Sequence, residues 1–124
     1  MLEDDMLAKK IWAVVGANQN REKYGNMIYR KLKKRNYQVY AVNPQYSDVE
    51  GDPCYPSLSS LPVKPDVINL VVAPAITKGI LEEAARLGIE NAWFQPGTYD
   101  DSVQALADKL GLKSVYACVL VATR

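Results

Sequence analysis

The sequence predicts an α/β fold, in which a parallel sheet of about five to six strands is covered by helices on both faces. Short apolar runs rich in β-branched residues alternate along the chain with segments whose apolar residues recur at helical spacing. The connections are short, so each helix returns the chain to a parallel neighbour on a right-handed path. We expect three layers in the order helix, sheet, helix. With strands numbered along the chain, the expected strand order is about 3-2-1-4-5.

The chain has 124 residues, which predicts one domain over residues 1–124, with residues 1–10 as an N-terminal lead-in. A formal net charge of +1 gives no electrostatic reason to expect binding to nucleic acid or to an anionic membrane. No apolar run approaches the roughly 20 residues that span a bilayer, and the acidic start does not resemble a signal peptide. We therefore expect a cytoplasmic protein with no nucleic-acid partner and no membrane partner.

The first half of the chain supplies two strands with a helix between them. The apolar run Ile11–Val15 predicts the first strand, and the helical pattern from about Tyr24 to Arg35 follows a glycine-containing loop. The next strand is Tyr37–Val42, which ends at an Asn-Pro pair. A proline-punctuated connection follows, in which only Pro53–Leu58 has the character of a short edge strand.

The second half repeats this alternation. Asp66–Ala73 is almost continuously apolar, which suits a central strand buried on both faces. A helix begins at Pro74 and ends before Gly88, in a pattern typical of a C-terminal glycine cap. The remaining predicted elements are a strand at Asn91–Gln95, a helix from about Asp100 to Leu110, and a last strand at Ser114–Val121.

Two local patterns add expectations. Thr98 with Asp101 three residues later resembles a capping pair for the last helix. The apolar stretch Val115–Ala122 predicts a strand at the edge of the sheet, where an uncovered edge favours association. A homodimer, or a complex with a partner enzyme subunit, is therefore one expectation for this chain.

The predicted ligand site lies where the parallel strands end. In such sheets ligands bind beyond the carboxyl ends of the strands, where the strand order reverses. The residues expected there are Gly16, Ala17, Asn18, Asn43, Pro44, Ala73, Pro74, Gln95, Pro96 and Gly97. The first of these loops enters a helix whose free N–H groups and positive dipole end suit a phosphate. Arg21 and Lys23 in that loop are expected to face phosphate oxygens.

The loop does not have the spacing of a dinucleotide site. G-x-G-x-x-G is absent, because Asn18 stands two residues after Gly16 and Gly25 lies nine residues further on than Gly16. The second strand ends in Asn43, where a dinucleotide fold normally places an acid for the ribose hydroxyls. A neutral amide tolerates a phosphorylated ribose.

The chain carries few groups that do chemistry. It contains no histidine, which excludes the Ser/His/Asp and Cys/His nucleophile systems and histidine ligation of a metal. Cys54 and Cys118 are too few and too far apart to suggest a metal site. We therefore predict no catalytic residue and no metal site.

Several motifs together resemble a known family. They are Val14-Val15-Gly16-Ala17-Asn18, Lys23-Tyr24-Gly25, Tyr37 followed by Val42-Asn43-Pro44, Gly51 with Tyr55-Pro56-Ser57-Leu58, Asp66-Val67, and Trp93-Phe94-Gln95 with Gly97. In this order and spacing, from about Lys10 to Cys118, they resemble the small stand-alone CoA-binding proteins. These are similar to the N-terminal domain of the succinyl-CoA synthetase α subunit. Phe94 and Pro96 depart from the usual Trp-Leu-Gln-x-Gly pattern.

The resemblance implies a Rossmann-like domain that binds coenzyme A or an acyl-CoA through its ADP and phosphate part, without evident catalysis of its own. It implies that the first loop contacts phosphates and that Asn43-Pro44 meets the adenosine or phosphate region. Ala73-Pro74 and Gln95-Pro96-Gly97 would line the path of the pantetheine arm. Two alternatives remain open: a small NAD(P)-binding oxidoreductase or redox sensor, and an interaction subunit with a vestigial nucleotide pocket.

The sequence allows more than one role for some side chains. Cys118 is expected to pack inertly in a strand near the core, and the alternative is a mixed disulfide with the CoA thiol. Trp93 is expected in the core. Tyr24, Tyr46 and Tyr99 are candidates to stack on adenine or to line a pocket. Gly16→Val is expected to abolish binding while the domain stays folded.

Overall fold

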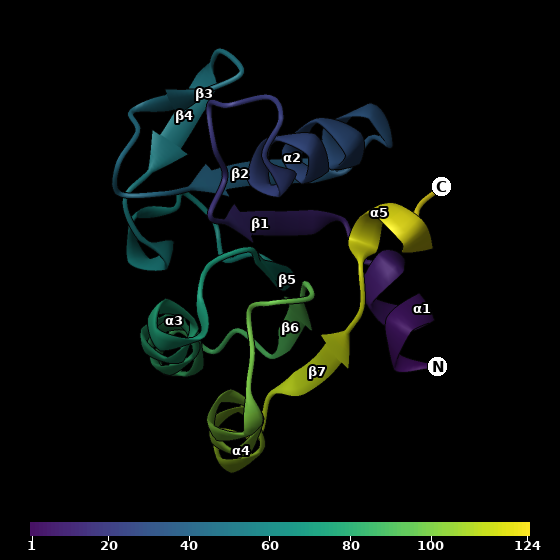
Figure 1. Cartoon of the computed structure of the whole chain (residues 1–124), viewed down its shortest axis with the longest axis vertical. Coiled ribbons are helices and arrows are strands. Elements are labelled where there is room, and N and C mark those ends of the chain that lie inside the picture. Colours follow the sequence, from purple (N-terminus) through teal and green to yellow (C-terminus); the bar gives the residue numbers. More distant parts are fainter.

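The computed structural model describes residues 1–124 as a Rossmann-like α/β fold with a seven-stranded sheet in the order β3-β4-β2-β1-β5-β6-β7 (Figure 1). The predicted fold class and strand order are confirmed. All neighbouring strands are parallel except β3 and β4, which form an antiparallel pair at one edge. The structure adds the two-residue strand β3 to those expected.

The elements follow the expected alternation closely. They are α1 (Leu2–Leu7), β1 (Ile11–Val15), α2 (Tyr24–Lys34), β2 (Gln38–Val42), β3 (Asp48–Val49), β4 (Asp52–Tyr55), the 3-10 helix η1 (Leu58–Ser60), β5 (Val67–Leu70), α3 (Pro74–Arg86), β6 (Asn91–Phe94), α4 (Asp101–Lys109), β7 (Lys113–Tyr116) and α5 (Val119–Ala122). None of the helices combines the length and the apolar character that crossing a membrane requires.

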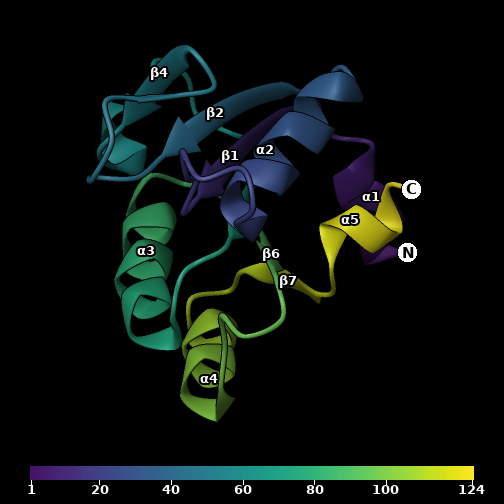
Figure 2. The same cartoon turned by 45° about the horizontal axis from the view of Figure 1, so that its top comes forward.

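Two apolar cores lie on the two faces of the sheet. Side chains alternate across a strand, so Trp12 and Val14 of β1 enter one core, and Ala13 and Val15 enter the other. The first core is covered by α1, α2 and α5, and the second by α3 and α4 (Figure 2). Trp93 is fully buried in the first core, as expected.

The end of the chain differs from the prediction. The strand stops at Tyr116, and the residues after it turn into α5 (Figure 1). Two side chains of the neighbouring β6 segment take the backbone groups that a strand partner would use. The indole Nε1 of Trp93 donates to Ala117 O at 2.9 Å, and Gln95 Oε1 accepts from Val119 N at 2.8 Å. The expected strand over Val115–Ala122 is therefore wrong beyond Tyr116. The shorter β7 still lies at the edge of the sheet, and the expected association stays a prediction.

The structure adds a helix within the lead-in and corrects the predicted cap of α4. Residues 2–7 of the lead-in form α1, and Met6 in this helix is fully buried in the first core. The N-cap of α4 is Asp100, whose Oδ1 accepts a hydrogen bond from Val103 N at 2.9 Å. Thr98 does not cap the helix, because its hydroxyl donates to Gln95 O at 2.7 Å and closes the preceding turn.

Candidate functional site

A cavity of about 630 Å³ lies over the carboxyl ends of β1, β5 and β6. The chain leaves β1 toward β2 on one side and later returns to place β5 on the other side, so this is the point where the strand order reverses. The residues that line the cavity are Gly16, Asn18, Lys23, Tyr24, Gly25, Val71, Val72, Ala73, Gln95, Pro96, Gly97, Thr98, Cys118 and Val121. The cavity thus occupies the place predicted for a ligand.

Two glycines allow α2 to begin directly beside the end of β1. Gly16 has a φ of +103°, and a Cβ there would lie 2.6 Å from Val71 O. A Cβ on Gly25 would overlap the carbonyl oxygen of Gly16. Glycine at both positions lets the helix approach the loop closely. Gly16 thus has a structural role as well, so this geometry leads us to expect that Gly16→Val also disturbs the fold, which the sequence alone did not predict.

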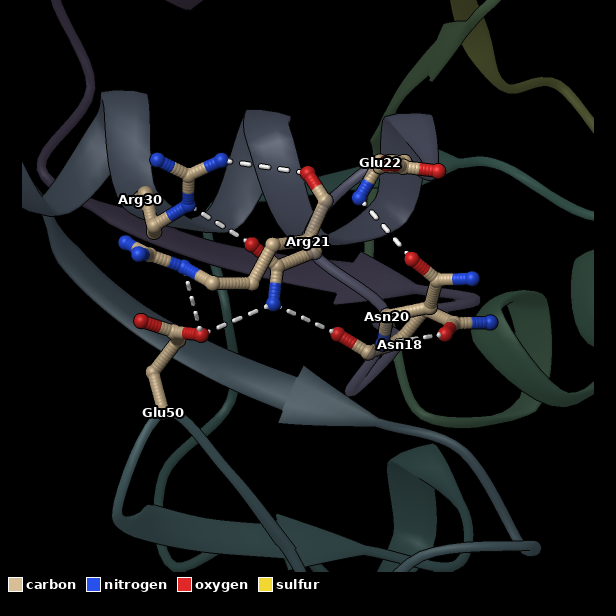
Figure 3. A network of polar contacts seen from close by, with 7 residues as sticks. Asn18, Asn20, Arg21, Glu22, Arg30 and Glu50 are labelled. Carbon is tan, nitrogen blue, oxygen red and sulfur yellow. Dashed lines mark hydrogen bonds and ion pairs between the residues drawn. The ribbon is translucent and has the colours of Figure 1, made fainter.

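Short side-chain turns shape the loop between these glycines. Asn18 Oδ1 accepts a hydrogen bond from Asn20 N at 2.8 Å, and Asn20 Oδ1 accepts one from Glu22 N at 3.0 Å (Figure 3). These are Asx turns, in which a side chain bonds to the backbone two residues on. Further polar contacts join the loop to α2 and to Glu50 in the turn between β3 and β4 (Figure 3).

The loop side of the cavity offers donors and positive charge. The backbone N–H groups of Asn18, Tyr24 and Gly25 have no hydrogen-bond partner within the protein, and all three residues line the cavity. Tyr24 and Gly25 form the first turn of α2, where the helix dipole is positive. Lys23 is the one charged residue in the lining, which contains no carboxylate. These residues fit a phosphate or diphosphate group.

The rest of the cavity wall is mainly apolar and neutral. Val71, Val72 and Ala73 follow β5, and Val121 extends from α5. Tyr24 and Val121 are large apolar side chains that remain 59% and 56% exposed. Gln95 and Thr98 add neutral polar groups to this wall. The lining therefore combines backbone donors and one positive charge with mainly apolar and neutral groups, a composition typical of small-molecule sites.

The structure gathers part of the predicted site at this cavity. The predicted residues that line it are Gly16, Asn18, Lys23, Ala73, Gln95 and Gly97, together with Pro96. The predicted residues outside the lining are Ala17, Arg21, Asn43, Pro44 and Pro74. Ala17 is fully buried in the first core.

Arg21 and Asn43 are engaged elsewhere. The guanidinium Nε of Arg21 lies 3.5 Å from Glu50 Oε2, so its charge faces a carboxylate. Asn43 Nδ2 donates to Ala17 O at 2.9 Å, and its Oδ1 accepts from Gln45 N at 2.9 Å. Both ends of the Asn43 amide are thus used within the protein, where the sequence predicted a ligand contact.

Sequence reasoning missed several lining residues. Tyr24 was only a stacking candidate, and Gly25, Val71, Val72, Thr98 and Val121 were not predicted for the site. Cys118 is the N-cap of α5 on the cavity wall, not a strand residue in the core, and its Sγ lies 3.5 Å from Gln95 Nε2.

The remaining candidates lie outside the lining. Tyr46 donates to Asn18 Oδ1 at 3.4 Å, and Tyr99 packs against the rings of Phe94 and Tyr116. Cys54 is buried, and burial raises the pKa of its thiol. No group of three or more His, Cys, Asp or Glu side chains is placed to hold a metal ion.

Known proteins share this sequence pattern and this fold. A family model described as "CoA binding domain" matches residues 10–124. A hypothetical protein from Pyrococcus horikoshii OT3 is 35% identical, with a TM-score of 0.87 over 94% of this chain and 82% of that chain. A conserved hypothetical protein from Pyrococcus furiosus is 36% identical, with a TM-score of 0.87 over 92% of this chain and 99% of that chain.

Two curated relatives are much longer than this chain. An ADP-forming acetate–CoA ligase of Archaeoglobus fulgidus is 39% identical over 83 residues, which make up 67% of this chain and 12% of the ligase. The corresponding ligase of Methanocaldococcus jannaschii is 31% identical over 80 residues, which make up 64% of this chain and 11% of that ligase. The similarity therefore concerns a small part of each ligase.

Proposed function

Because this chain belongs to the CoA-binding domain family, we propose that it binds coenzyme A or an acyl-CoA at the cavity over β1, β5 and β6, without a reaction of its own. One observation carries the proposal. The backbone N–H groups of Asn18, Tyr24 and Gly25 have no partner within the protein. They line the same cavity as Lys23, and the other lining residues are uncharged. A ligand with a phosphorylated end and a long, mostly neutral arm matches this combination of donors, one positive charge and neutral lining residues.

The phosphate end of the ligand is assigned to the loop and the start of α2. N–H groups at a helix N-terminus bind anions through hydrogen bonds and through the helix dipole. Lys23 adds a flexible point charge that reaches phosphate oxygens in several directions. When bound, the ligand supplies a thiol or thioester.

The pantetheine arm is assigned to the apolar side of the cavity. Its methylene groups suit Val72, Ala73 and Val121, and its amides suit the neutral side chains of Gln95 and Thr98. Covering Tyr24 and Val121 would also remove exposed apolar surface from water. The ligases that match this chain are named for CoA, and this chain matches 12% and 11% of their lengths.

The NAD(P) alternative receives less support from these contacts. A dinucleotide fold uses an acid at the end of its second strand to hold the ribose hydroxyls. Asn43 stands there, and both ends of its amide are hydrogen-bonded within the protein. No carboxylate in the cavity lining replaces it.

Calorimetric titration tests the proposal. We expect saturable binding of CoA and acetyl-CoA, and no binding of NAD or NADP at the same concentrations. Lys23→Gln should weaken CoA binding by about tenfold to a hundredfold, since a hydrogen bond to a charged group contributes about 1.5–3 kcal/mol. Lys34→Gln, in the exposed last turn of the same helix, is the matched control and should bind as the unchanged protein does. Tight binding of NAD without binding of CoA would overturn the proposal.

A further inference from the structure

We infer that Asn26 and Asn43 are positioning residues, which orient the two peptide groups on either side of Asn18 so that their N–H groups face the ligand's phosphates. The inference rests on the proposed function and extends it to residues that the cavity lining does not include. According to this inference, the neutral amide side chains of Asn26 and Asn43 control the orientation of the phosphate-binding loop. A separate hydrogen bond supports the role of each residue.

Asn43 fixes the peptide group before Asn18. Its Nδ2 donates to Ala17 O at 2.9 Å. Because a peptide bond is planar and trans, its C=O and its N–H point in opposite directions. The N–H of Asn18 is therefore directed away from Asn43. It has no partner within the protein, and Asn18 lines the cavity.

Asn26 fixes the peptide group after Asn18. This residue is fully buried in the first turn of α2, and its Nδ2 donates to Asn18 O at 2.8 Å. By the same planarity, the N–H of Gln19 is directed away from Asn26, and it too has no partner within the protein. Asn18 and Gln19 therefore offer two successive N–H groups that are free to donate to an anion.

Charged neighbours determine which way the Asn26 amide faces. Its Nδ2 also donates to Glu50 Oε2 at 3.0 Å, and its Oδ1 accepts from Arg30 Nε at 2.7 Å. A flipped amide would place its NH₂ against the guanidinium and its oxygen against the carboxylate. Arg30 also donates to Arg21 O at 3.2 Å, which fixes a third loop carbonyl. The acidic and basic side chains therefore act on the loop through Asn26.

Isosteric substitutions test the two amides. Asn43→Asp and Asn26→Asp each keep the side-chain shape and replace the donor NH₂ with an oxygen, which repels the loop carbonyl. We expect each variant to bind CoA at least tenfold more weakly, while the binding of pantetheine, which lacks phosphate, stays unchanged. Asn36→Asp, an exposed residue beyond the C-terminal end of α2, makes the same chemical change away from the loop and should bind CoA normally.

The chemical shifts of backbone amide N–H groups distinguish a positioning role from a merely structural one. Titration of the ¹⁵N-labelled protein with inorganic pyrophosphate should shift the Asn18 and Gln19 N–H signals, and this response should be lost in Asn43→Asp. If Asn26→Asp does not fold, Glu50→Gln removes the charge that orients Asn26 and should weaken CoA binding by a smaller factor. Normal CoA binding by Asn43→Asp, or an equal loss of pantetheine and CoA, would overturn the inference. Absence of CoA binding by the unchanged protein would instead overturn the proposed function.

Discussion

Gly25 shows how one missing side chain sets the geometry of the candidate site. The first turn of α2 lies against the loop after β1, and a Cβ on Gly25 would overlap the carbonyl oxygen of Gly16. The N–H groups at the start of α2 can reach the cavity because nothing separates helix and loop. Part of the resemblance to CoA-binding proteins, the Lys23-Tyr24-Gly25 motif, thus has a steric reason.

Gly25→Ala should therefore destabilise the fold. Placing a methyl group in this contact forces the helix and the loop apart, and overpacking of this kind typically costs about 1–3 kcal/mol. Gly79→Ala is the matched control. Gly79 lies in α3 with nothing within 4 Å of a new Cβ, so alanine should stabilise the helix by roughly 0.5–1 kcal/mol. Urea unfolding followed by tryptophan fluorescence compares the two, and equal midpoints would contradict the argument.

Asp52 makes the stability of the fold depend on pH. Hydrogen bonds from Lys33 and Tyr29, both at 2.7 Å, hold the pKa of this carboxyl below its usual value. A carboxyl with a lowered folded-state pKa stabilises the protein above its unfolded pKa of about 3.9, and this contribution is lost as the pH falls through the folded-state value. Burial raises the pKa of Tyr29, which keeps its hydroxyl protonated as a donor to Asp52.

Asp52→Asn should accordingly flatten the acid side of the stability profile. We expect the unchanged protein to lose more stability than the variant between pH 5 and pH 2, measured as the urea midpoint at each pH. Asp108→Asn, an exposed carboxyl on α4 without a side-chain hydrogen bond, serves as the comparison. Parallel profiles for the unchanged protein and Asp52→Asn would show that the contacts with α2 do not favour the ionised carboxylate.

At the scale of elements, local sequence patterns predicted most helix and strand boundaries. They failed where side chains distant in sequence determine the backbone conformation. The strand Ile11–Val15 was predicted with its observed bounds, and α2 begins at the predicted Tyr24. These segments have a clear hydrophobic periodicity and are bounded by residues that end a strand or a helix. The chain end was predicted as a strand because its residues are apolar and β-branched. It became α5 because Trp93 and Gln95 bind the backbone of Ala117 and Val119, a contact that no local pattern contains.

The cap of α4 offers a test at this scale. Asp100 accepts from Val103 N, whereas the predicted pair of Thr98 and Asp101 makes no such bond. Asp100→Ala should lower the melting temperature more than Asp101→Ala, because only the first change leaves a helix N–H without its partner. Circular dichroism across a temperature ramp measures both. A larger effect of Asp101→Ala than of Asp100→Ala would contradict the assignment of the cap to Asp100.

At the scale of the whole molecule, the sequence located the site but could not assign all of its contacts. The four loops at the carboxyl ends of the strands were expected from the strand alternation, and three of them line the cavity. The loop at Asn43 does not, because Asn43 hydrogen-bonds to the first loop and to its own turn. Val121 reaches the cavity only because α5 folds back over the sheet. Such pairings depend on three-dimensional neighbours.

Ligand binding should stabilise the whole fold if the proposed function holds. A ligand that binds only the folded state adds about 2.7 kcal/mol at one hundred times its Kd. For a chain of 124 residues this corresponds to a rise in melting temperature of roughly 10 °C. We expect this rise with CoA and none with NAD at equal concentration, measured by differential scanning calorimetry. A rise with both nucleotides would favour a general phosphate site over one for CoA.

The central position of β1 also governs how fast the chain acquires its structure. On one side Ile11 pairs with Gln38, and on the other Trp12 pairs with Val67, so the first strand is complete only after two distant segments have arrived. Parallel pairings of this kind require loop closure before they yield contacts, which slows folding relative to helical bundles. The loop that contains Gly16 and Asn18 takes its final form only once β1, β2 and β5 lie side by side. A nascent chain would therefore gain affinity for its ligand late, together with the assembly of the sheet.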